Sequence, residues 1–231
     1  MTQAIAPTIV LLPGMDGTGE LLTDLRDQLS HSHTVQIISY PRQTPLNYDQ
    51  LTAHVRERLP TGPSVILGES FGGPIAIEIA ALETERVIGL ILASTFAKHP
   101  LPNFLVPLAR LVSPSLLPQR VIDAALLGRD GTDNLRQQLA RIIGYMAPDV
   151  LTARAIAALQ VDKIARLRAV RCPTLCLTGA RDRLLRKQSV SEILTAQPGC
   201  KHHAINGPHM ILETHPIESA HAIKRFVSGL K

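Results

Sequence analysis

The chain has 231 residues, of which 45% are hydrophobic and 19% are charged. This composition excludes disordered and collagen-like proteins, and the length allows a sizeable buried core. No run approaches the roughly 20 apolar residues of a membrane-spanning helix. Residues 1–8 have neither a basic residue nor a small-residue cleavage pattern, so we expect a soluble, cytoplasmic protein without a secretory signal.

The net charge is +5, from 24 basic and 19 acidic side chains. Such an excess would fit a nucleic-acid-binding protein if aromatic residues lay among the basic ones to stack on bases. The chain has no Trp, three Tyr and four Phe, and it has no recognisable DNA-binding motif. We therefore expect no nucleic-acid partner.

Six short apolar or β-branched runs predict strands, and stretches with apolar residues at helical spacing separate them. The runs cover residues 8–12, 34–39, 64–68, 87–93, 174–178 and 202–205. Alternation of strand and helix predicts an α/β fold with a mostly parallel six-stranded sheet and helices on both faces. In such a fold the active site lies at the carboxyl ends of the strands.

The strand signals stop between residues 97 and 168, where six prolines interrupt helical stretches. We interpret this part as a helical lid inserted into a core domain formed by residues 1–96 and 169–231. The lid contains ten Lys or Arg residues and five Asp residues, so it carries the whole positive excess. This charge is either a solvated helical face or a surface that recruits an acidic substrate or partner.

The third predicted strand leads into a G-x-S-x-G pattern at residues 68–72, and a helical run follows. This order is typical of a sharp turn that holds the hydroxyl of Ser70 above the sheet, while Gly68 and Gly72 leave room for the turn. The helix that follows directs its first amide groups at developing negative charge. We predict that Ser70 is a nucleophile, and a purely structural turn is the alternative.

A serine hydroxyl needs a neighbouring imidazole to take its proton. Of nine histidines, His209 lies in a Gly/Pro loop directly after the last predicted strand. Asp182 follows the preceding strand, where an acid that orients the imidazole belongs. Asp123, Asp130 and Asp133 are weaker candidates because they lie in the predicted lid. A structural loop histidine and a helix-capping aspartate are the alternatives.

The first strand leads into a glycine-containing loop, residues 13–19, which would face the nucleophile. The backbone N–H groups of Met15 and Phe71 are the predicted oxyanion donors, and Gly14 helps the loop to turn tightly. The loop lacks the sequence of a phosphate-binding or dinucleotide-binding loop. Asp16 either orders the loop or contacts substrate.

The three cysteines, Cys172, Cys176 and Cys200, are too few for a disulfide framework, and none belongs to a C-x-x-C pair. A metal site built from Cys172, Cys200 and His202 would lack a clear fourth ligand. We expect structural thiols in strands and no metal.

Together these residues resemble the α/β-hydrolase superfamily, which has an oxyanion loop, a G-x-S-x-G turn, an acid and a histidine after successive strands. Residues 209–216 also resemble the usual ending of that superfamily. The chain reaches its first strand by about residue 8, so the resemblance implies a reduced sheet without the two leading strands of many members. Its P-G-M-D sequence at residues 13–16 replaces the His-Gly start of many esterases and is similar to the loop of acyltransferases such as phytyl ester synthases.

The resemblance implies a serine carboxylic-ester hydrolase that forms an acyl-enzyme and needs no cofactor. Its partner would be a small acyl ester. The alternatives are a thioesterase or pimeloyl-carrier methyl esterase that recruits an acidic acyl carrier protein or a CoA ester, an acyltransferase, and a receptor that only binds ligand. Seven lid residues would either wall an acyl pocket or form the lid's own core: Leu101, Phe104, Leu105, Leu108, Leu111, Leu116 and Leu117.

Overall fold

A single sheet of six parallel strands forms the centre of the protein. The computed structural model describes residues 6–100 and 118–230. The strand order is β2-β1-β3-β4-β5-β6, and every neighbouring pair is parallel. The strands are β1 (Thr8–Leu12), β2 (Val35–Ile37), β3 (Ser64–Glu69), β4 (Val87–Ala93), β5 (Thr174–Gly179) and β6 (Lys201–Ile205). The predicted α/β fold with six strands is confirmed, although the edge strand β2 is shorter than its apolar run.

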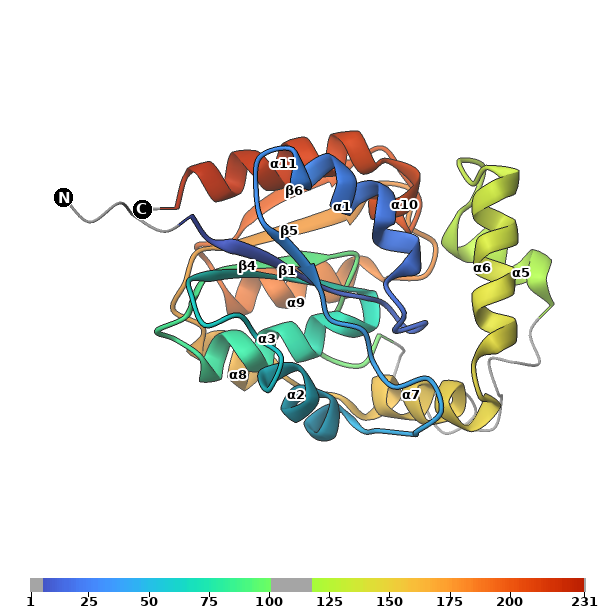
Figure 1. The fold of residues 1–231 in the computed structure, drawn as a ribbon, viewed down its shortest axis with the longest axis horizontal. Coiled ribbons are helices and arrows are strands. Elements are labelled where there is room, and N and C mark those ends of the chain that lie inside the picture. Colours follow the sequence, from blue (N-terminus) through green and yellow to red (C-terminus); the bar gives the residue numbers. More distant parts are fainter. Residues whose placement is uncertain (1–5, 101–117, 231) are drawn as a thin grey trace.

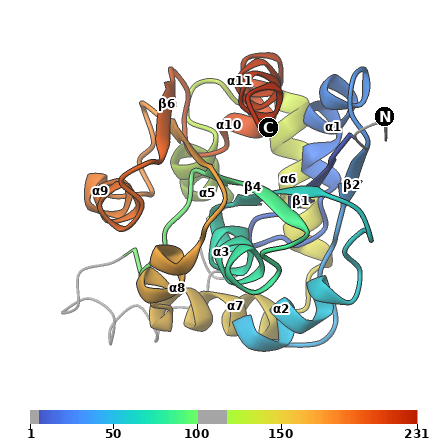
Figure 2. The ribbon, with the colours of Figure 1, turned by 90° about the vertical axis from the view of Figure 1, so that its left-hand side faces the viewer.

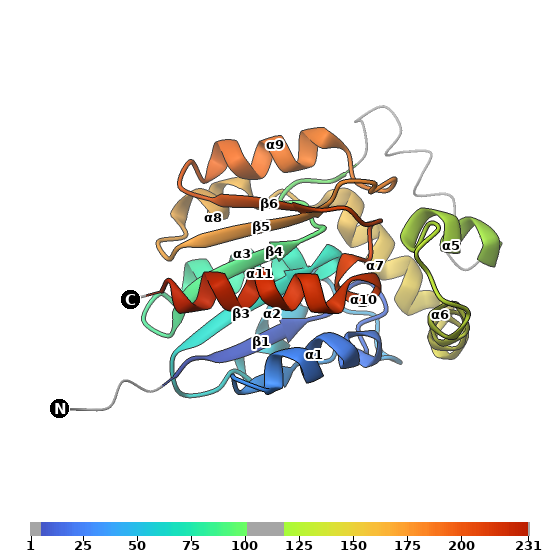
Figure 3. The ribbon, with the colours of Figure 1, turned by 90° about the horizontal axis from the view of Figure 1, so that it is seen from above.

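Helices cover both faces of this sheet, as Figures 1 and 3 show. One face is covered by α1 (Thr23–Ser30) and α11 (Pro216–Ser228), with the short α10 (Ile211–Thr214) beside them. The other face is covered by α2 (Tyr48–Arg56), α3 (Gly73–Leu82), α8 (Ile164–Ala169) and α9 (Lys187–Ala196). Figure 2 looks along the strands and shows these two layers on opposite sides of the sheet.

The two layers follow from the alternation of side chains along each strand. In β1, Ile9 and Leu11 pack with α1 and α11, whereas Val10 and Leu12 pack with α2 and α3. Because both faces are covered, all four side chains are fully buried. Helix α3 is apolar over almost its whole surface since it lies between the sheet, α2 and α8.

The segment between β4 and β5, residues 97–168, is called the inserted segment below. Its described part is helical and contains α5 (Gln119–Leu126), α6 (Asp133–Tyr145) and α7 (Pro148–Gln160) before α8. In Figure 1, α5 and α6 lie beyond one end of the sheet, away from the chain termini. The seven apolar residues between Leu101 and Leu117 that sequence analysis singled out lie outside the described residues.

Among the described residues no single helix is long and apolar enough to cross a membrane. The pair α6 and α7 meets the length and composition requirement only when joined, and the two helices are bent by 102° relative to each other.

The position of the site follows from the strand order. The chain passes from β1 outward to β2 and then returns to place β3 on the other side of β1. Leu12 at the end of β1 pairs with Gly68 near the end of β3. The segments that follow these strands, residues 13–19 and 69–72, therefore leave the sheet side by side, at the point where α/β proteins bind their ligands.

Candidate active site

Ser70 occupies a strained turn between β3 and α3. Its φ angle is 46°, a left-handed value that costs energy in a residue with a side chain. A Cβ atom on Gly68 would lie 2.6 Å from the Cβ atom of Ala76, and one on Gly72 would lie 2.6 Å from the carbonyl oxygen of Leu12. Both glycines are therefore required by the close approach of neighbouring segments.

Side chains from other segments also hold the Ser70 turn through hydrogen bonds. The Thr95 hydroxyl donates a hydrogen bond to the carbonyl oxygen of Ser70. The Tyr48 hydroxyl donates to the carbonyl oxygen of Phe71 at 3.2 Å, and the two aromatic rings stack with centroids 4.7 Å apart. These contacts fix the peptide group that contains the Phe71 N–H and the peptide group that follows it, within the short 3-10 helix Ser70–Gly72.

A chain of two hydrogen bonds joins the three residues that sequence analysis selected. His209 Nε2 lies 2.9 Å from Ser70 Oγ, and His209 Nδ1 lies 2.8 Å from Asp182 Oδ2. His209 is only 2% exposed. The structure thus brings Ser70, His209 and Asp182 together in the order in which a proton would move from a serine nucleophile to an oriented base.

Asp182 is fixed by the backbone of its own loop. Its Oδ1 atom accepts hydrogen bonds from the amides of Leu184 and Leu185, at 2.8 Å and 2.9 Å. Burial alone would raise the pKa of the Asp182 carboxyl, but the hydrogen bond and charge of His209, together with these two amides, lower it below its ordinary value. Asp182 is therefore an anion at neutral pH and can stabilise a protonated imidazole.

The other aspartates considered from the sequence lie elsewhere. Asp123 pairs with Arg136 at 3.8 Å, and Asp130 pairs with Arg181 at 2.8 Å. Asp133 occupies the first turn of α6.

The loop of residues 13–19 lies against the Ser70 turn. Asp16 Oδ2 accepts hydrogen bonds from the amide and the hydroxyl of Thr18, at 2.9 Å and 2.6 Å, so Asp16 orders the loop. Left-handed φ angles occur at Gly17 and Gly19, whereas a Cβ atom on Gly14 would have only ordinary contacts, the nearest at 3.6 Å. The tight turning of the loop therefore comes from its later glycines.

The two predicted oxyanion donors have free amides. Within residues 6–100 and 118–230, no backbone or side-chain acceptor is hydrogen-bonded to the N–H of Met15 or of Phe71. Met15 follows the end of β1, and Phe71 follows the serine at the start of a helix. One of these amides belongs to a residue that lines the cavity with Ser70, and the other directly follows Ser70, so both are suited to receive an oxygen atom of a substrate.

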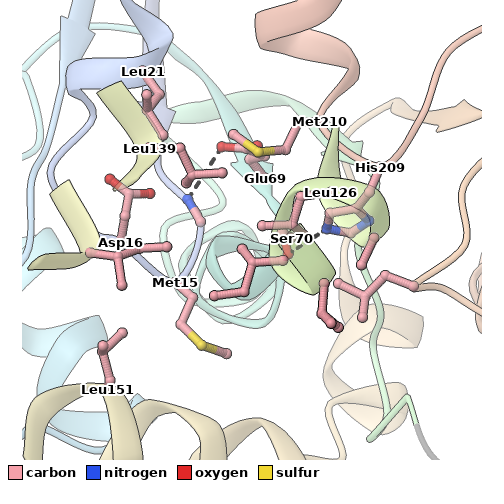
Figure 4. A pocket seen from close by; sticks show the side chains of 16 residues that line it. Met15, Asp16, Leu21, Glu69, Ser70, Leu126, Leu139, Leu151, His209 and Met210 are labelled. Atoms are coloured by element: carbon pink, nitrogen blue, oxygen red, sulfur yellow. Dashed lines mark hydrogen bonds between the residues drawn. The ribbon is translucent and has the colours of Figure 1, made fainter. Parts of the chain in front are cut away.

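A cavity of about 300 Å³ opens at Ser70. Figure 4 shows the hydrogen-bonded Ser70 and His209 among the apolar side chains of the cavity wall. Asp16, Glu69, Ser70 and His209 are the polar lining residues, and the apolar ones are Met15, Leu21, Val121, Ile122, Ala125, Leu126, Leu139, Ile143, Leu151, Leu184 and Met210. Seven of these come from the inserted segment, so that segment supplies most of the apolar wall.

Comparison with known proteins identifies the family. The family model described as serine aminopeptidase, S33, matches residues 42–213, about three quarters of the chain. The chain belongs to this family of α/β hydrolases. A hydrolase from Oleispira antarctica has a similar fold, with a TM-score of 0.84 and 14% sequence identity, over 96% of this chain and 91% of that one. The resemblance to α/β hydrolases predicted from the sequence is therefore confirmed.

Two curated relatives share more sequence with this hydrolase. Polyketide synthase ThaQ of Burkholderia thailandensis is 29% identical over 90% of this chain, which corresponds to 11% of that protein. Phytyl ester synthase 1 of Arabidopsis thaliana is 32% identical over 48% of this chain, which corresponds to 17% of that protein. The hydrolase thus spans only a small part of the length of these relatives.

Sequence analysis missed a buried carboxyl pair in this hydrolase. Glu69, one residue before the serine, and Glu213, on α10, are 4% and 7% exposed, and the charge of Glu69 raises the pKa of the neighbouring Glu213 carboxyl. Glu69 Oε2 also accepts a hydrogen bond from the amide of Gly14 at 3.2 Å. Glu69 therefore ties the loop of residues 13–19, at Gly14, to the end of β3.

Sequence analysis also missed Arg154 on α7, whose side chain is 1% exposed. It lies in line with Val150, Leu151, Ala157 and Ala158, which are also buried and recur at helical spacing. A charged residue in the middle of an apolar helical stripe was the signal that could have drawn attention to it.

The cysteines and histidines form no metal centre in the described part of this hydrolase. Cys172, Cys176 and Cys200 are free thiols, and no group of three or more His, Cys, Asp or Glu side chains there has the arrangement of a metal site. Burial raises the pKa of Cys176 to about 12, so its thiol stays protonated at neutral pH.

Proposed function

We propose that this protein is a serine hydrolase that cleaves carboxylic esters with an apolar acyl group. The observation that carries the proposal is the position of Ser70 Oγ, which is hydrogen-bonded to His209 and opens into an apolar cavity of about 300 Å³. The acyl chain would lie in this cavity because burial of apolar surface favours binding there.

The reaction would proceed in two halves. Ser70 Oγ attacks the ester carbonyl carbon while His209 Nε2 takes its proton, and the carbonyl oxygen becomes an oxyanion held by the amides of Met15 and Phe71. The C–O bond to the alcohol then breaks, and His209 returns the proton to the leaving oxygen. Water repeats the same steps on the acyl-enzyme, which releases the acid and restores Ser70.

The first test is hydrolysis of p-nitrophenyl esters from acetate to palmitate by the wild type and by Ser70→Ala. We expect turnover with an optimum at one chain length and a loss of several orders of magnitude in the variant. Covalent labelling of Ser70 by a fluorophosphonate would separate a reactive nucleophile from a ligand receptor. Unimpaired turnover by Ser70→Ala, or no labelling of the wild type, would overturn the proposal.

Other acyl compounds that a serine nucleophile could cleave should be tested in the same assay. An aminoacyl p-nitroanilide tests the activity in the family description, and an acyl-CoA thioester at low and high salt tests recruitment by positive charge. Three basic side chains of the inserted segment pair with carboxylates of the core instead: Arg141 with Glu20 at 3.4 Å, and Lys163 and Arg166 with Glu78 at 3.0 Å and 2.9 Å. This pairing favours a neutral small ester over an acidic carrier.

Acyl transfer to an alcohol is the second candidate, and the relative named phytyl ester synthase favours it. The same acyl-enzyme would react with an alcohol in place of water. Addition of a long-chain alcohol during turnover should then divert acyl groups into a new ester, which chromatography detects. If only the free acid forms at every alcohol concentration, hydrolysis alone remains.

A further inference from the structure

A buried guanidinium holds the loop that carries the Met15 amide. Arg154 Nη1 donates hydrogen bonds to the carbonyl oxygens of Met15 and Asp16, at 2.7 Å and 2.9 Å, and Nη2 donates to that of Pro41 at 2.9 Å. The guanidinium carbon lies 5.5 Å from the centre of the Tyr40 ring. The side chain reaches this loop from α7, far along the sequence.

This guanidinium is costly to bury. None of the ion pairs among the described residues includes Arg154, and its partners are neutral carbonyl groups. Burial lowers its pKa below the ordinary value for arginine. An apolar side chain of similar volume would pack at this place without such a penalty. The planar guanidinium instead supplies several N–H donors in fixed directions, and these donors orient the carbonyl groups that they contact.

Hydrogen bonds hold the peptide groups around Met15, whereas the Met15 amide itself donates none within the described part of the chain. The Gly14 amide donates to Glu69, the Gly14 carbonyl accepts from the Gly17 amide at 3.1 Å, and the Met15 carbonyl accepts from Arg154. A Cβ atom on Gly17 would lie 2.4 Å from Arg154 Nη1, so the loop is shaped around the guanidinium. The direction of the Met15 N–H is therefore set by peptide groups that these contacts hold.

We infer that Arg154 is a positioning residue, which aims the Met15 amide at the oxyanion through its hold on the Met15 and Asp16 carbonyl groups. The inference rests on the proposed function, because it presumes that an ester oxygen becomes negative beside Ser70. Arg154 itself is not among the residues that line the cavity at Ser70. Its effect should therefore fall on the transition state rather than on substrate binding.

The test compares Arg154→Met with the wild type on the best p-nitrophenyl ester. We expect kcat to fall about 10²-fold, a loss that a misplacement of about 1 Å can cause, while KM changes by less than about threefold. The matched control is Arg166→Met, which removes another arginine contact between the inserted segment and the core but lies at Glu78. An equal loss in the control, or kcat near the wild-type value in Arg154→Met, would overturn the inference.

Two further measurements distinguish positioning from general destabilisation. An aliphatic trifluoromethyl ketone, which forms an oxyanion adduct with a serine nucleophile, should lose affinity in Arg154→Met by about the same factor as kcat/KM. Added guanidinium ion should restore part of the turnover of Arg154→Ala, and Arg154→Lys should lie between Arg154→Met and the wild type. Unchanged inhibitor affinity together with no rescue in folded variants, as judged by thermal unfolding, would assign Arg154 a structural role only.

The outcome for the wild type keeps the two proposals apart. If the wild type hydrolyses no ester and Ser70 is not labelled, the proposed function fails before Arg154 is considered. If the wild type is active and the folded Arg154 variants match it, only the positioning role fails.

Discussion

The carboxyl group of Glu69 lies beside that of Glu213 in the interior, and its Oε2 atom accepts a hydrogen bond from the amide of Gly14 at 3.2 Å. Two neighbouring buried carboxyl groups repel each other when both are ionised, so one of them keeps a proton. Burial raises the pKa of Glu69 to about 7 and that of Glu213 well above its ordinary value, and the charge of Asp16 acts in the same direction. The pair thus retains a proton at pH values at which exposed glutamates are ionised.

This retained proton predicts how stability depends on pH. The folded protein binds it more tightly than the unfolded chain, so the free energy of unfolding should fall as pH rises from about 4.5 to about 7. One proton bound more tightly by the folded protein lowers the free energy of unfolding by on the order of 3 kcal/mol over this range. Glu69→Gln keeps an acceptor for Gly14 but cannot ionise, so its fall should be shallower. Urea unfolding of both proteins between pH 5 and pH 8 checks this, and parallel curves would contradict it.

Asp182→Asn should abolish most turnover without unfolding the protein. The side chain would still accept hydrogen bonds from Leu184 and Leu185, but its amide would no longer hold His209 in the tautomer that accepts the proton of Ser70. We expect kcat to fall about 10⁴-fold with a much smaller change in KM. The exposed Asp133 offers a control, and Asp133→Asn should turn over ester like the wild type. Comparable losses in the two variants would remove Asp182 from the proposed mechanism.

Ala125→Phe should shorten the preferred acyl chain. Ala125 lines the cavity from α5, and a phenyl ring there would occupy space that a long acyl chain needs. We expect kcat/KM for the longest esters to fall at least about tenfold while acetate is little affected. Ala124 is exposed and does not line the cavity, so Ala124→Phe is the matched control. A uniform change over all chain lengths would place the acyl chain elsewhere.

Gly72→Ala should disturb the Ser70 turn. The added Cβ atom would lie 2.6 Å from the Leu12 carbonyl oxygen and 2.7 Å from that of Pro13, so the loop and the turn would have to separate. We expect a loss of about 1–3 kcal/mol in the free energy of unfolding and a loss of activity. At Gly62, by contrast, a Cβ atom has no neighbour within 4 Å, and Gly62→Ala should change neither. Equal thermal stability of the two variants would argue against a tightly packed turn.

The sequence predicted those parts of the fold and site that depend on local pattern. Buried parallel strands such as β4 read as continuous apolar runs, and Ser70 was found because a strand, a glycine-flanked serine and a helix follow one another. Strand β2 was overestimated because the apolar run continues beyond the pairing with β1, which involves Ile9 to Leu11 only. The end of an edge strand is set by its single neighbour rather than by its own residues.

The features that sequence analysis missed depend on contacts between distant segments. Glu69 looks like an ordinary polar residue within its motif, and its raised pKa comes from its burial in the folded protein. Arg154 lies in a largely apolar helix, and its partners are backbone carbonyl groups, which have no signature in the sequence. Pairings of this kind become visible only when the fold brings the segments together.

The three carbonyl groups held by Arg154 have a consequence for chimaeras of this protein. A core grafted with the corresponding helices of another α/β hydrolase would leave the carbonyl oxygens of Met15, Asp16 and Pro41 without their donor unless the graft supplied an arginine at the same place. Transplanting the helices to change the cavity wall would therefore also remove the contact that holds this loop. The cavity wall and the hold on the loop of residues 13–19 are thus linked through one side chain of α7.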